Sequence, residues 1–272
     1  MNNPVANTVL RPVLTYYDVA PGVVAFSSTR RGGYGTGRYG GFNVNRWCGD
    51  DPVTVGRNRR LLCEELGLAS DDRLVIPHQT HGTAVFDVSE DFLAVSDSSR
   101  RDVALDGVDA LMTDVPGVCV GVSTADCIPV LLYDEVRKAC CAVHAGWRGT
   151  VARIVETAVG RMQSRFGTRP EHLKAVIGPG ISLEAFEVGD EVYDAFRYAG
   201  FDMEAISRRF EKWHIDLWAC NRMQLERSGV RPEAIVTAGV CTYFNSDDYF
   251  SARRLGVASG RIFNGIMLRD NL

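Results

Sequence analysis

Three short apolar runs follow one another in the middle of the chain, and no helical pattern separates them. They cover residues 118–122, 130–133 and 139–143. Several of their apolar residues are consecutive, which is typical of strands in a sheet that is covered on both faces. Strands that are neighbours in sequence favour antiparallel or mixed pairing over a regular series of βαβ units. The sequence therefore predicts a fold of the α+β class, in which helices accompany mixed β-sheets.

Helical patterns flank this strand-rich region. Asp51 and Pro52 form an N-cap and first-turn proline, and the apolar positions that follow continue until Gly67. From Thr150, apolar residues recur at helical spacing until Gly167, which predicts one long helix. We also expect helices at 191–199 and 216–227, strands at 21–29, 74–76, 84–88, 173–177 and 234–240, and a closing β pair formed by 249–253 and 261–268.

The composition is that of one folded unit. The 272 residues contain no repeat and no Pro/Ser-rich linker, so we expect a single domain spanning residues 1–272. A net charge of -4 argues against a general positive field for nucleic acid. No apolar run approaches the ~18–20 residues of a membrane span, and the first residues lack the pattern of a signal peptide. The sequence predicts a cytoplasmic protein without nucleic-acid or membrane partners, and it gives no signal for an oligomeric state.

The eight cysteines do not form a disulfide framework or a local metal motif. They are too dilute for a disulfide scaffold, and no CxxC pair occurs. Cys63 lies in a helical pattern, and Cys119, Cys140 and Cys141 lie in apolar strand patterns. We expect these four to pack as small hydrophobic residues. Any metal site must be assembled from distant segments.

A glycine-rich stretch, RRGGYGTGRYGG at residues 30–41, follows a predicted strand. It contains the pattern G-x-G-x-x-G, but no helical pattern begins until Pro52, so the helix that a dinucleotide-binding fingerprint requires is missing. Glycines free backbone amides, and Arg30, Arg31 and Arg38 lie beside them, so the stretch could hold an anion such as phosphate. A surface turn with solvated arginines is the alternative.

Three side chains that can bind a metal lie at predicted strand ends or in adjoining turns. They are His81 in HQTHG, Cys127 in TADCIPVLLYD and His144 in AVHAGWRGT. Because 46 and then 17 positions separate them, only the fold can bring them together. Two imidazoles and a thiolate are good zinc ligands, and they leave the fourth position that a catalytic zinc needs for water or substrate. These three residues are the predicted zinc ligands.

Two other interpretations of these residues stay open. His78 and His81 form an HxxH pair in a turn bounded by proline and glycine, so only one of them is expected to point into the site, and we choose His81. Cys127 and His144 could instead be a nucleophile and its base, without any metal.

Arg148 is a candidate anion contact. It follows His144 closely and precedes the helix predicted from Thr150. The free N–H groups and the dipole at the N-terminus of a helix both favour an anion, so phosphate is the expected ligand here.

The motifs QTHG, ADC and HAGWRGT, which contain the three predicted ligands, together resemble the YfiH family, also called the laccase-domain or polyphenol oxidase family. Further matching segments span nearly the whole chain: RRGGYGTGRYGGFNV, GDDPVTVGRNRRLL, DALMTD, IGPGIS, FEVGDEV, DLWACNRMQL and FSARRLGVASGR. The resemblance implies a layered sandwich of stacked mixed β-sheets flanked by helices. It also implies a zinc ion held by His81, Cys127 and His144.

The resemblance further implies an enzyme of small-molecule substrates. Members are described as purine nucleoside enzymes that cleave adenosine, inosine or methylthioadenosine with phosphate and deaminate adenosine. We expect this activity rather than the multicopper oxidation of phenols that the family name records, because five histidines are too few for several copper centres. The ligands would also be the catalytic residues, and Asp126 would orient a ligand or cap a turn.

Each reaction makes its own demand on the site. Deamination needs a water molecule activated for attack on the purine carbon that carries the amino group. Phosphorolysis needs phosphate on the face of the ribose opposite the base, for which Arg148, Arg30 and Arg38 are the candidates. Asn43 could contact a ribose hydroxyl or the purine edge.

Three other functions are alternatives. A family relation to cysteine-dependent deamidating toxins keeps open a metal-free Cys/His amidase that edits peptidoglycan precursors. A copper-dependent polyphenol oxidase and a non-enzymatic binding module are the other two.

Overall fold

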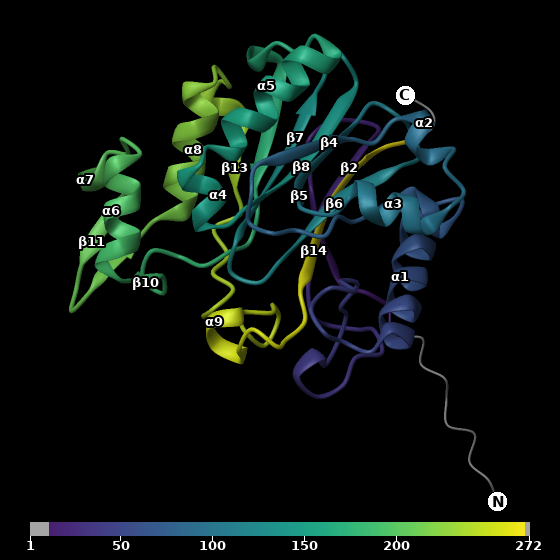
Figure 1. The fold of residues 1–272 in the computed structure, drawn as a ribbon, viewed down its shortest axis with the longest axis horizontal. Helices are drawn as coiled ribbons and strands as arrows, with labels where there is room; N and C mark the ends of the chain where they lie inside the picture. Colours follow the sequence, from purple (N-terminus) through teal and green to yellow (C-terminus); the bar gives the residue numbers. More distant parts are fainter. Residues whose placement is uncertain (1–10, 270–272) are drawn as a thin grey trace, which may run out of the picture.

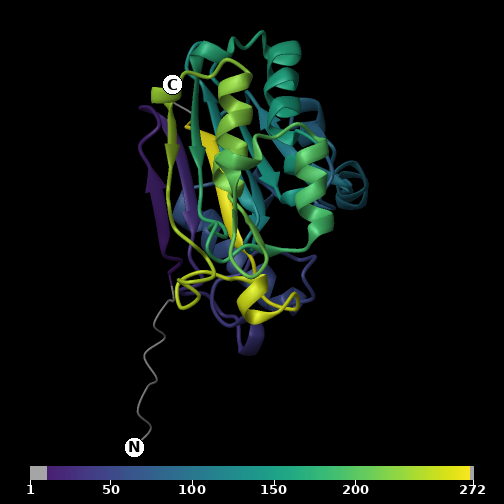
Figure 2. The ribbon, with the colours of Figure 1, turned by 90° about the vertical axis from the view of Figure 1, so that its left-hand side faces the viewer.

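The computed structural model describes residues 11–269, in which two large sheets lie face to face between helices (Figures 1 and 2). One sheet has the strand order β1-β2-β14-β6-β3, with β1 (Leu14–Tyr17), β2 (Val23–Ser28), β14 (Ile262–Leu268), β6 (Cys119–Thr124) and β3 (Leu74–Val75). The other has the order β13-β9-β7-β8-β5-β4, with β13 (Ile235–Thr237), β9 (Leu173–Ile177), β7 (Ile128–Asp134), β8 (Ala139–Ala145), β5 (Val108–Thr113) and β4 (Ala84–Asp87). Both sheets mix parallel and antiparallel pairs, as predicted.

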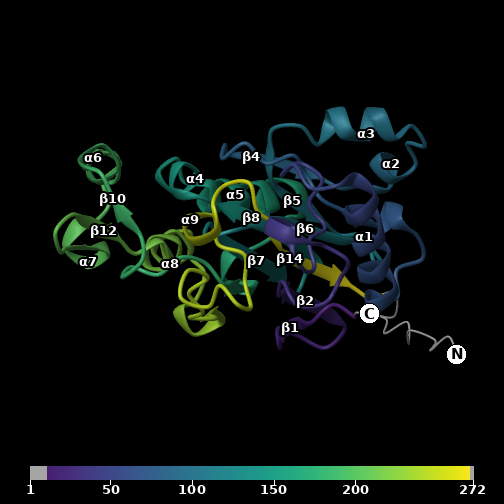
Figure 3. The ribbon, with the colours of Figure 1, turned by 90° about the horizontal axis from the view of Figure 1, so that it is seen from below.

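A smaller sheet and the helices surround this sandwich. The small sheet consists of β10 (Glu187–Val188), β12 (Trp213–Ile215) and β11 (Ser207–Arg209). With α6 and α7 it stands to one side of the large sheets (Figure 3). The helices are α1 (Pro52–Leu66), α2 (Glu90–Leu93), α3 (Ser98–Ala104), α4 (Trp147–Val151), α5 (Ile154–Phe166), α6 (Asp190–Tyr198), α7 (Met203–Ile206), α8 (Leu217–Arg227) and α9 (Ala252–Leu255).

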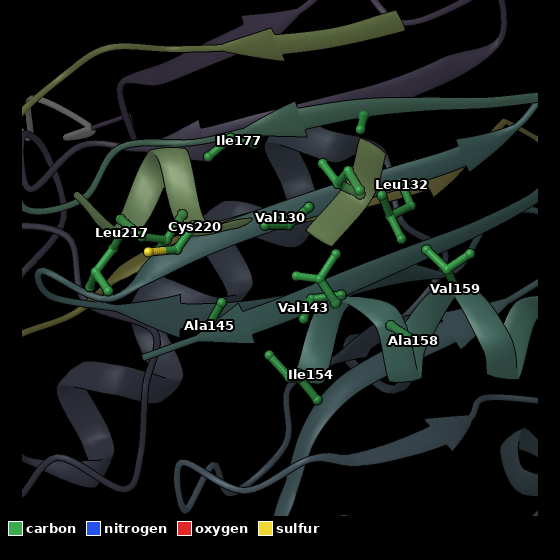
Figure 4. Packing of buried hydrophobic residues seen from close by; sticks show 14 of the residues in the cluster. Val130, Leu132, Val143, Ala145, Ile154, Ala158, Val159, Ile177, Leu217 and Cys220 are labelled. Atoms are coloured by element: carbon green, nitrogen blue, oxygen red, sulfur yellow. The ribbon is translucent and has the colours of Figure 1, made fainter. Parts of the chain in front are cut away.

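The six-stranded sheet is buried on both faces, which explains its continuous apolar strands. In β7, Leu131 and Tyr133 point into the core between the two sheets. Val130 and Leu132 alternate with them and pack under the helices. Figure 4 shows these two residues beside Ala158 and other side chains of α5. The four layers are therefore α1, the five-stranded sheet, the six-stranded sheet, and α5 with α8.

The predicted packing cysteines are confirmed. Cys140 faces the core between the sheets and Cys141 faces the helices, while Cys63 of α1 and Cys119 of β6 lie together in the core under α1. Burial raises the pKa of all four thiols, so they stay protonated and apolar.

The helix expected from Thr150 is broken. The structure has α4 and α5 in its place, and between them Arg153 has a left-handed backbone with φ 64°. The apolar spacing runs through this break, so the pattern alone could not reveal it. Helix α1 is confirmed, with the Asp51 carboxylate accepting from the Thr54 backbone N–H at 2.9 Å and Gly67 as its C-cap.

The predicted closing β pair is wrong. Residues 261–268 contain β14, but its partners are β2 and β6. Residues 249–251 form no strand, and α9 begins at Ala252. A buried apolar strand pairs where its two faces are best covered, and β14 gains partners on both edges in the middle of the five-stranded sheet.

Two predictions concern the chain as a whole. In the described part of the chain, none of the helices combines the length and the apolar character needed to cross a bilayer. The single domain expected over residues 1–272 includes residues 1–10 and 270–272, which lie outside the described residues.

Candidate metal centre

Three side chains from separate parts of the chain meet at one end of the large sheets. The ligand atoms of His81, Cys127 and His144 all lie within 4.8 Å of one another. His144 belongs to β8, and Cys127 directly precedes β7. The register of these strands places Ile128 opposite Ala145, so Cys127 and His144 lie at the same end of these two neighbouring strands. His81 joins them from the loop between β3 and β4, and the structure thus brings the three predicted ligands together.

A buried aspartate of β5 organises the cluster. Asp109 is fully buried and lies 2.7 Å from Nδ1 of His144. When the N–H at Nδ1 donates a hydrogen bond to the carboxylate, Nε2 carries no proton and is free to bind a metal. Burial by itself would raise the pKa of Asp109, but the hydrogen bond and charge of His144 outweigh burial and lower it. Asp109 was missed in the sequence, although an acidic residue inside the apolar run of β5 is a usable signal.

The same carboxylate also holds the loop that carries His81. It accepts the backbone N–H groups of Thr80, His81 and Gly82 at 3.2, 3.0 and 2.7 Å. His81 has φ 64°, a left-handed conformation that is unfavourable for a residue with a side chain. The three hydrogen bonds stabilise this conformation, so Asp109 positions two of the three ligands.

Cys127 and His144 change each other's proton affinity. Burial alone would raise the pKa of Cys127, but the charge and hydrogen bond of His144, and then those of His81, lower it to about 6. Burial would lower the pKa of His144, but Cys127 and Asp109 raise it to about 9. The pair therefore favours a thiolate, the form of cysteine that binds metals and acts as a nucleophile.

Gly146 has no Cβ atom, and this leaves room for the side chains of Cys127 and His81. A Cβ atom at this position would lie 3.0 Å from Sγ of Cys127 and 2.8 Å from Cδ2 of His81. Its φ is -68°, which any residue can adopt, so only the close approach of the ligands requires glycine here.

Asp126 holds the turn before Cys127. Its backbone is left-handed, with φ 83°. One carboxylate oxygen accepts the Thr242 hydroxyl at 2.7 Å, and the other accepts the Arg253 backbone N–H at 2.7 Å. Both oxygens are thus engaged by protein groups, and the side chain positions the turn rather than presenting a free carboxylate to a ligand.

A cavity of about 560 Å³ opens beside the cluster, within the range of about 300–1,000 Å³ that is usual for small-molecule sites. Of the three ligands, His81 is exposed, Cys127 is partly buried and His144 is buried, so the cluster is reached from solvent. The cavity is lined by Asn45, Trp47, Cys48, His78, Gln79, His81, Ser123, Ala125, Asp126, Cys127, His144, Ile181, Phe186, Ala252, Arg253, Gly256, Val257 and Arg261.

Trp47 and His78 form an aromatic part of the cavity wall. Their ring centroids are 4.6 Å apart, and Trp47 is 40% exposed. Nδ1 of His78 lies 2.6 Å from the carboxylate of Asp106. His78 therefore lines the cavity without belonging to the ligand cluster, in agreement with the choice of His81.

The four expected substrate contacts do not line this cavity. Arg148 is exposed and lies over the ring of Trp147. Arg30 donates to the carbonyl groups of Gly40 and Ser246, and Arg38 is exposed in a short 3-10 turn.

Asn43 is fully buried, and its side chain forms hydrogen bonds within the protein. Its Nδ2 donates to Asp50 at 2.8 Å, and its Oδ1 accepts the backbone N–H groups of Asn45 and Arg261 at 3.1 and 3.2 Å. The neighbouring residues Asn45 and Trp47 reach the cavity instead. The motif thus indicated the right segment but not the right side chain.

Known proteins resemble this chain over almost its whole length. The sequence model of the family described as "Multi-copper polyphenol oxidoreductase laccase" matches residues 24–269. A Bacteroides thetaiotaomicron protein named "Purine nucleoside phosphorylase" is 50% identical over 246 residues, which cover 89% of this chain and 90% of that protein. "Adenosine deaminase RL5", from an unknown prokaryotic organism, is 44% identical over 248 residues, which cover 90% of this chain and 94% of that protein.

The fold agrees with a solved structure. The crystal structure of YlmD from Geobacillus stearothermophilus superposes with a TM-score of 0.86 at 29% identity, and the match covers 96% of this chain and 99% of that one. The structural likeness and the matching family model together show that this chain belongs to the multi-copper polyphenol oxidoreductase laccase family, the YfiH family that its motifs resemble.

Proposed function

We propose that this protein is a zinc-dependent purine nucleoside enzyme. It would cleave adenosine, inosine or methylthioadenosine with phosphate, releasing the base and a ribose 1-phosphate, and it would deaminate adenosine. The observation that carries the proposal is the convergence of His81, Cys127 and His144 at a cavity of nucleoside size. The names of the two similar proteins, a purine nucleoside phosphorylase and an adenosine deaminase, support the same substrate class.

The three side chains fit one zinc ion better than a group of copper ions. Two imidazoles and one thiolate are a usual zinc donor set, and the adjoining cavity leaves room for a fourth ligand. Within residues 11–269 this is the one cluster of three or more such side chains, whereas multicopper oxidation needs several centres. Bound there, zinc would supply Lewis-acid activation of water or of a substrate oxygen.

The protein's own groups would keep the reacting parts in place. Asp109 fixes the ring of His144 and the loop of His81, and Asp126 fixes the turn that presents Cys127. Trp47 is 40% exposed and lines the cavity, so its ring offers apolar surface that a purine base can contact.

The proposal is tested by incubating the zinc-loaded protein with adenosine, with and without inorganic phosphate, and separating the products by chromatography. We expect inosine without phosphate, and adenine that appears only when phosphate is added. The purified protein should contain about one zinc ion per chain, and a chelator should abolish both reactions. A zinc-loaded preparation that forms no inosine, adenine or hypoxanthine would refute the proposal.

A metal-free amidase is a second candidate because Asp109, His144 and Cys127 also form the aspartate–histidine–cysteine series of a nucleophilic enzyme. His81 distinguishes the two functions. Replacing it with alanine removes a metal ligand but leaves that series intact. Loss of nucleoside turnover and of zinc in His81→Ala supports the zinc enzyme, whereas amide hydrolysis that persists in this variant and in chelator supports the amidase.

A further inference from the structure

Two arginines of the C-terminal segment line the metal cavity, and the structure uses them differently. Arg261 donates from Nη1 and Nη2 to the carbonyl groups of Val257, Ser259 and Gly260, at 2.6 to 3.0 Å. Its guanidinium therefore holds its own loop. Arg253 is exposed, and within residues 11–269 its side chain makes one hydrogen bond, from Nη1 to the Glu187 carbonyl at 3.0 Å.

Arg253 is held close to the metal ligands by its backbone. Its N–H donates to the carboxylate of Asp126, the residue before Cys127. Its guanidinium carbon lies 5.5 Å from the ring centroid of Phe186, which also lines the cavity. The backbone anchor and the ring together keep the side chain on the cavity wall, while most of its N–H donors have no protein partner among residues 11–269.

The charge around Arg253 favours an anion. No carboxylate of residues 11–269 forms an ion pair with it. The carboxylate of Glu187, whose pKa is lowered mainly by Lys212 and in a smaller part by Arg253, is paired with Lys212 at 2.7 Å. Asp126 is the one acidic residue in the cavity lining, and both of its oxygens already accept hydrogen bonds. The planar fork of a guanidinium fits the oxygen atoms of a phosphate, which it can bind through two parallel hydrogen bonds.

We propose that Arg253 binds the inorganic phosphate that attacks the nucleoside. This inference rests on the proposed phosphorolytic function, and it assigns the phosphate to the C-terminal segment instead of the glycine-rich stretch or Arg148. In the step, an oxygen of hydrogen phosphate forms a bond to the anomeric ribose carbon as the bond from that carbon to the purine nitrogen breaks. The electron pair of the broken bond stays on the purine, and the proton of hydrogen phosphate ends on that nitrogen. The products are the neutral base and ribose 1-phosphate.

The test compares Arg253→Gln with Arg254→Gln in the zinc-loaded full-length protein. Arg254 is the matched control because it is the next residue of α9, carries the same charge, is exposed and lies outside the cavity lining. We expect Arg253→Gln to raise the KM for inorganic phosphate by about 10–100-fold, the loss expected for a hydrogen bond to a charged group. Phosphorolysis should fall relative to phosphate-independent deamination by at least about tenfold, and Arg254→Gln should match the wild type.

Two further readouts separate phosphate binding from a structural role. Arg253→Lys keeps the charge but not the fork, so its KM for phosphate should lie between those of the wild type and Arg253→Gln. Zinc content and Tm should be those of the wild type in both variants. An unchanged KM for phosphate in Arg253→Gln overturns this inference alone. A wild-type protein that forms no ribose 1-phosphate overturns the proposed phosphorolysis, and the role of Arg253 with it.

Discussion

Two aspartate–histidine pairs involve the loop that carries His81 or hold it in place, and the pairs differ in burial rather than in the length of their hydrogen bonds. The carboxylate–imidazole distance is 2.7 Å for Asp109 and His144 and 2.6 Å for Asp106 and His78. The side chains of the first pair are 0% and 4% exposed, and those of the second are 66% and 38% exposed. Water competes for the exposed pair and weakens it, whereas water is excluded from the buried pair. Of two hydrogen bonds of nearly equal length, the one from which solvent is excluded is therefore expected to fix its histidine more firmly.

The largest expected effect tests the buried pair. Asp109→Asn keeps the shape of the side chain but removes its charge, and its amide cannot accept from His144 and from all three loop N–H groups. We expect metal affinity to fall by about 10–100-fold, because the partner that orients a ligand is lost. Competition with a chromophoric chelator measures this affinity. Affinity within about twofold of the wild type would show that burial gives the pair no special role.

A second substitution tests the packing around the buried pair instead of its hydrogen bonds. Gly146→Ala places a methyl group against Cys127 and His81, and we expect it to destabilise the loaded protein by about 1–3 kcal/mol. Denaturant unfolding with and without zinc measures this loss, which should be larger with zinc.

Gly160→Ala is the matched control for this change. Gly160 lies in α5, is exposed, and has open space at its Cβ position. Alanine there should stabilise the protein by about 0.5–1 kcal/mol, because glycine is a poor helix residue. Equal destabilisation by both substitutions would contradict the close packing at Gly146.

The smallest effect is expected at the exposed pair. Asp106→Asn removes a charge that water already screens, and it leaves the stack of His78 on Trp47 in place. The free energy of unfolding should change by less than about 1 kcal/mol, and metal affinity should not change measurably. A loss of affinity as large as that of Asp109→Asn would break the comparison between the two pairs.

The sequence predicted secondary structure well where residues within one helix or strand determine it. Helix α1 begins and ends where its proline and glycine place it, and the buried strands β6, β7 and β8 were indicated by their apolar runs. The break at Arg153 and the partners of β14 were not predicted, because they depend on what packs against those segments.

In the candidate site, too, some residues were predicted from the sequence and others were not. The three predicted ligands lie together at the cavity, but none of the four expected substrate contacts lines it. Arg148 is near the predicted ligands along the chain, and the arginines of the glycine-rich stretch belong to a family motif. The residues that line the cavity nevertheless include Trp47 and Arg253 and none of these arginines. Sequence proximity does not determine which way a side chain points, since that depends on the packing of distant segments.

By itself, the sequence determined the class of fold, the longer helices and most of the strands, and the identity of two imidazoles and one thiolate that suit zinc. These follow from local periodicity, capping and ligand chemistry. Only the tertiary structure decided that Asp109 joins two of these ligands, that Gly146 makes room for them, and that Arg253 faces the cavity. Each of these depends on contacts between residues far apart in the chain, and such contacts exist only after the sheets have packed.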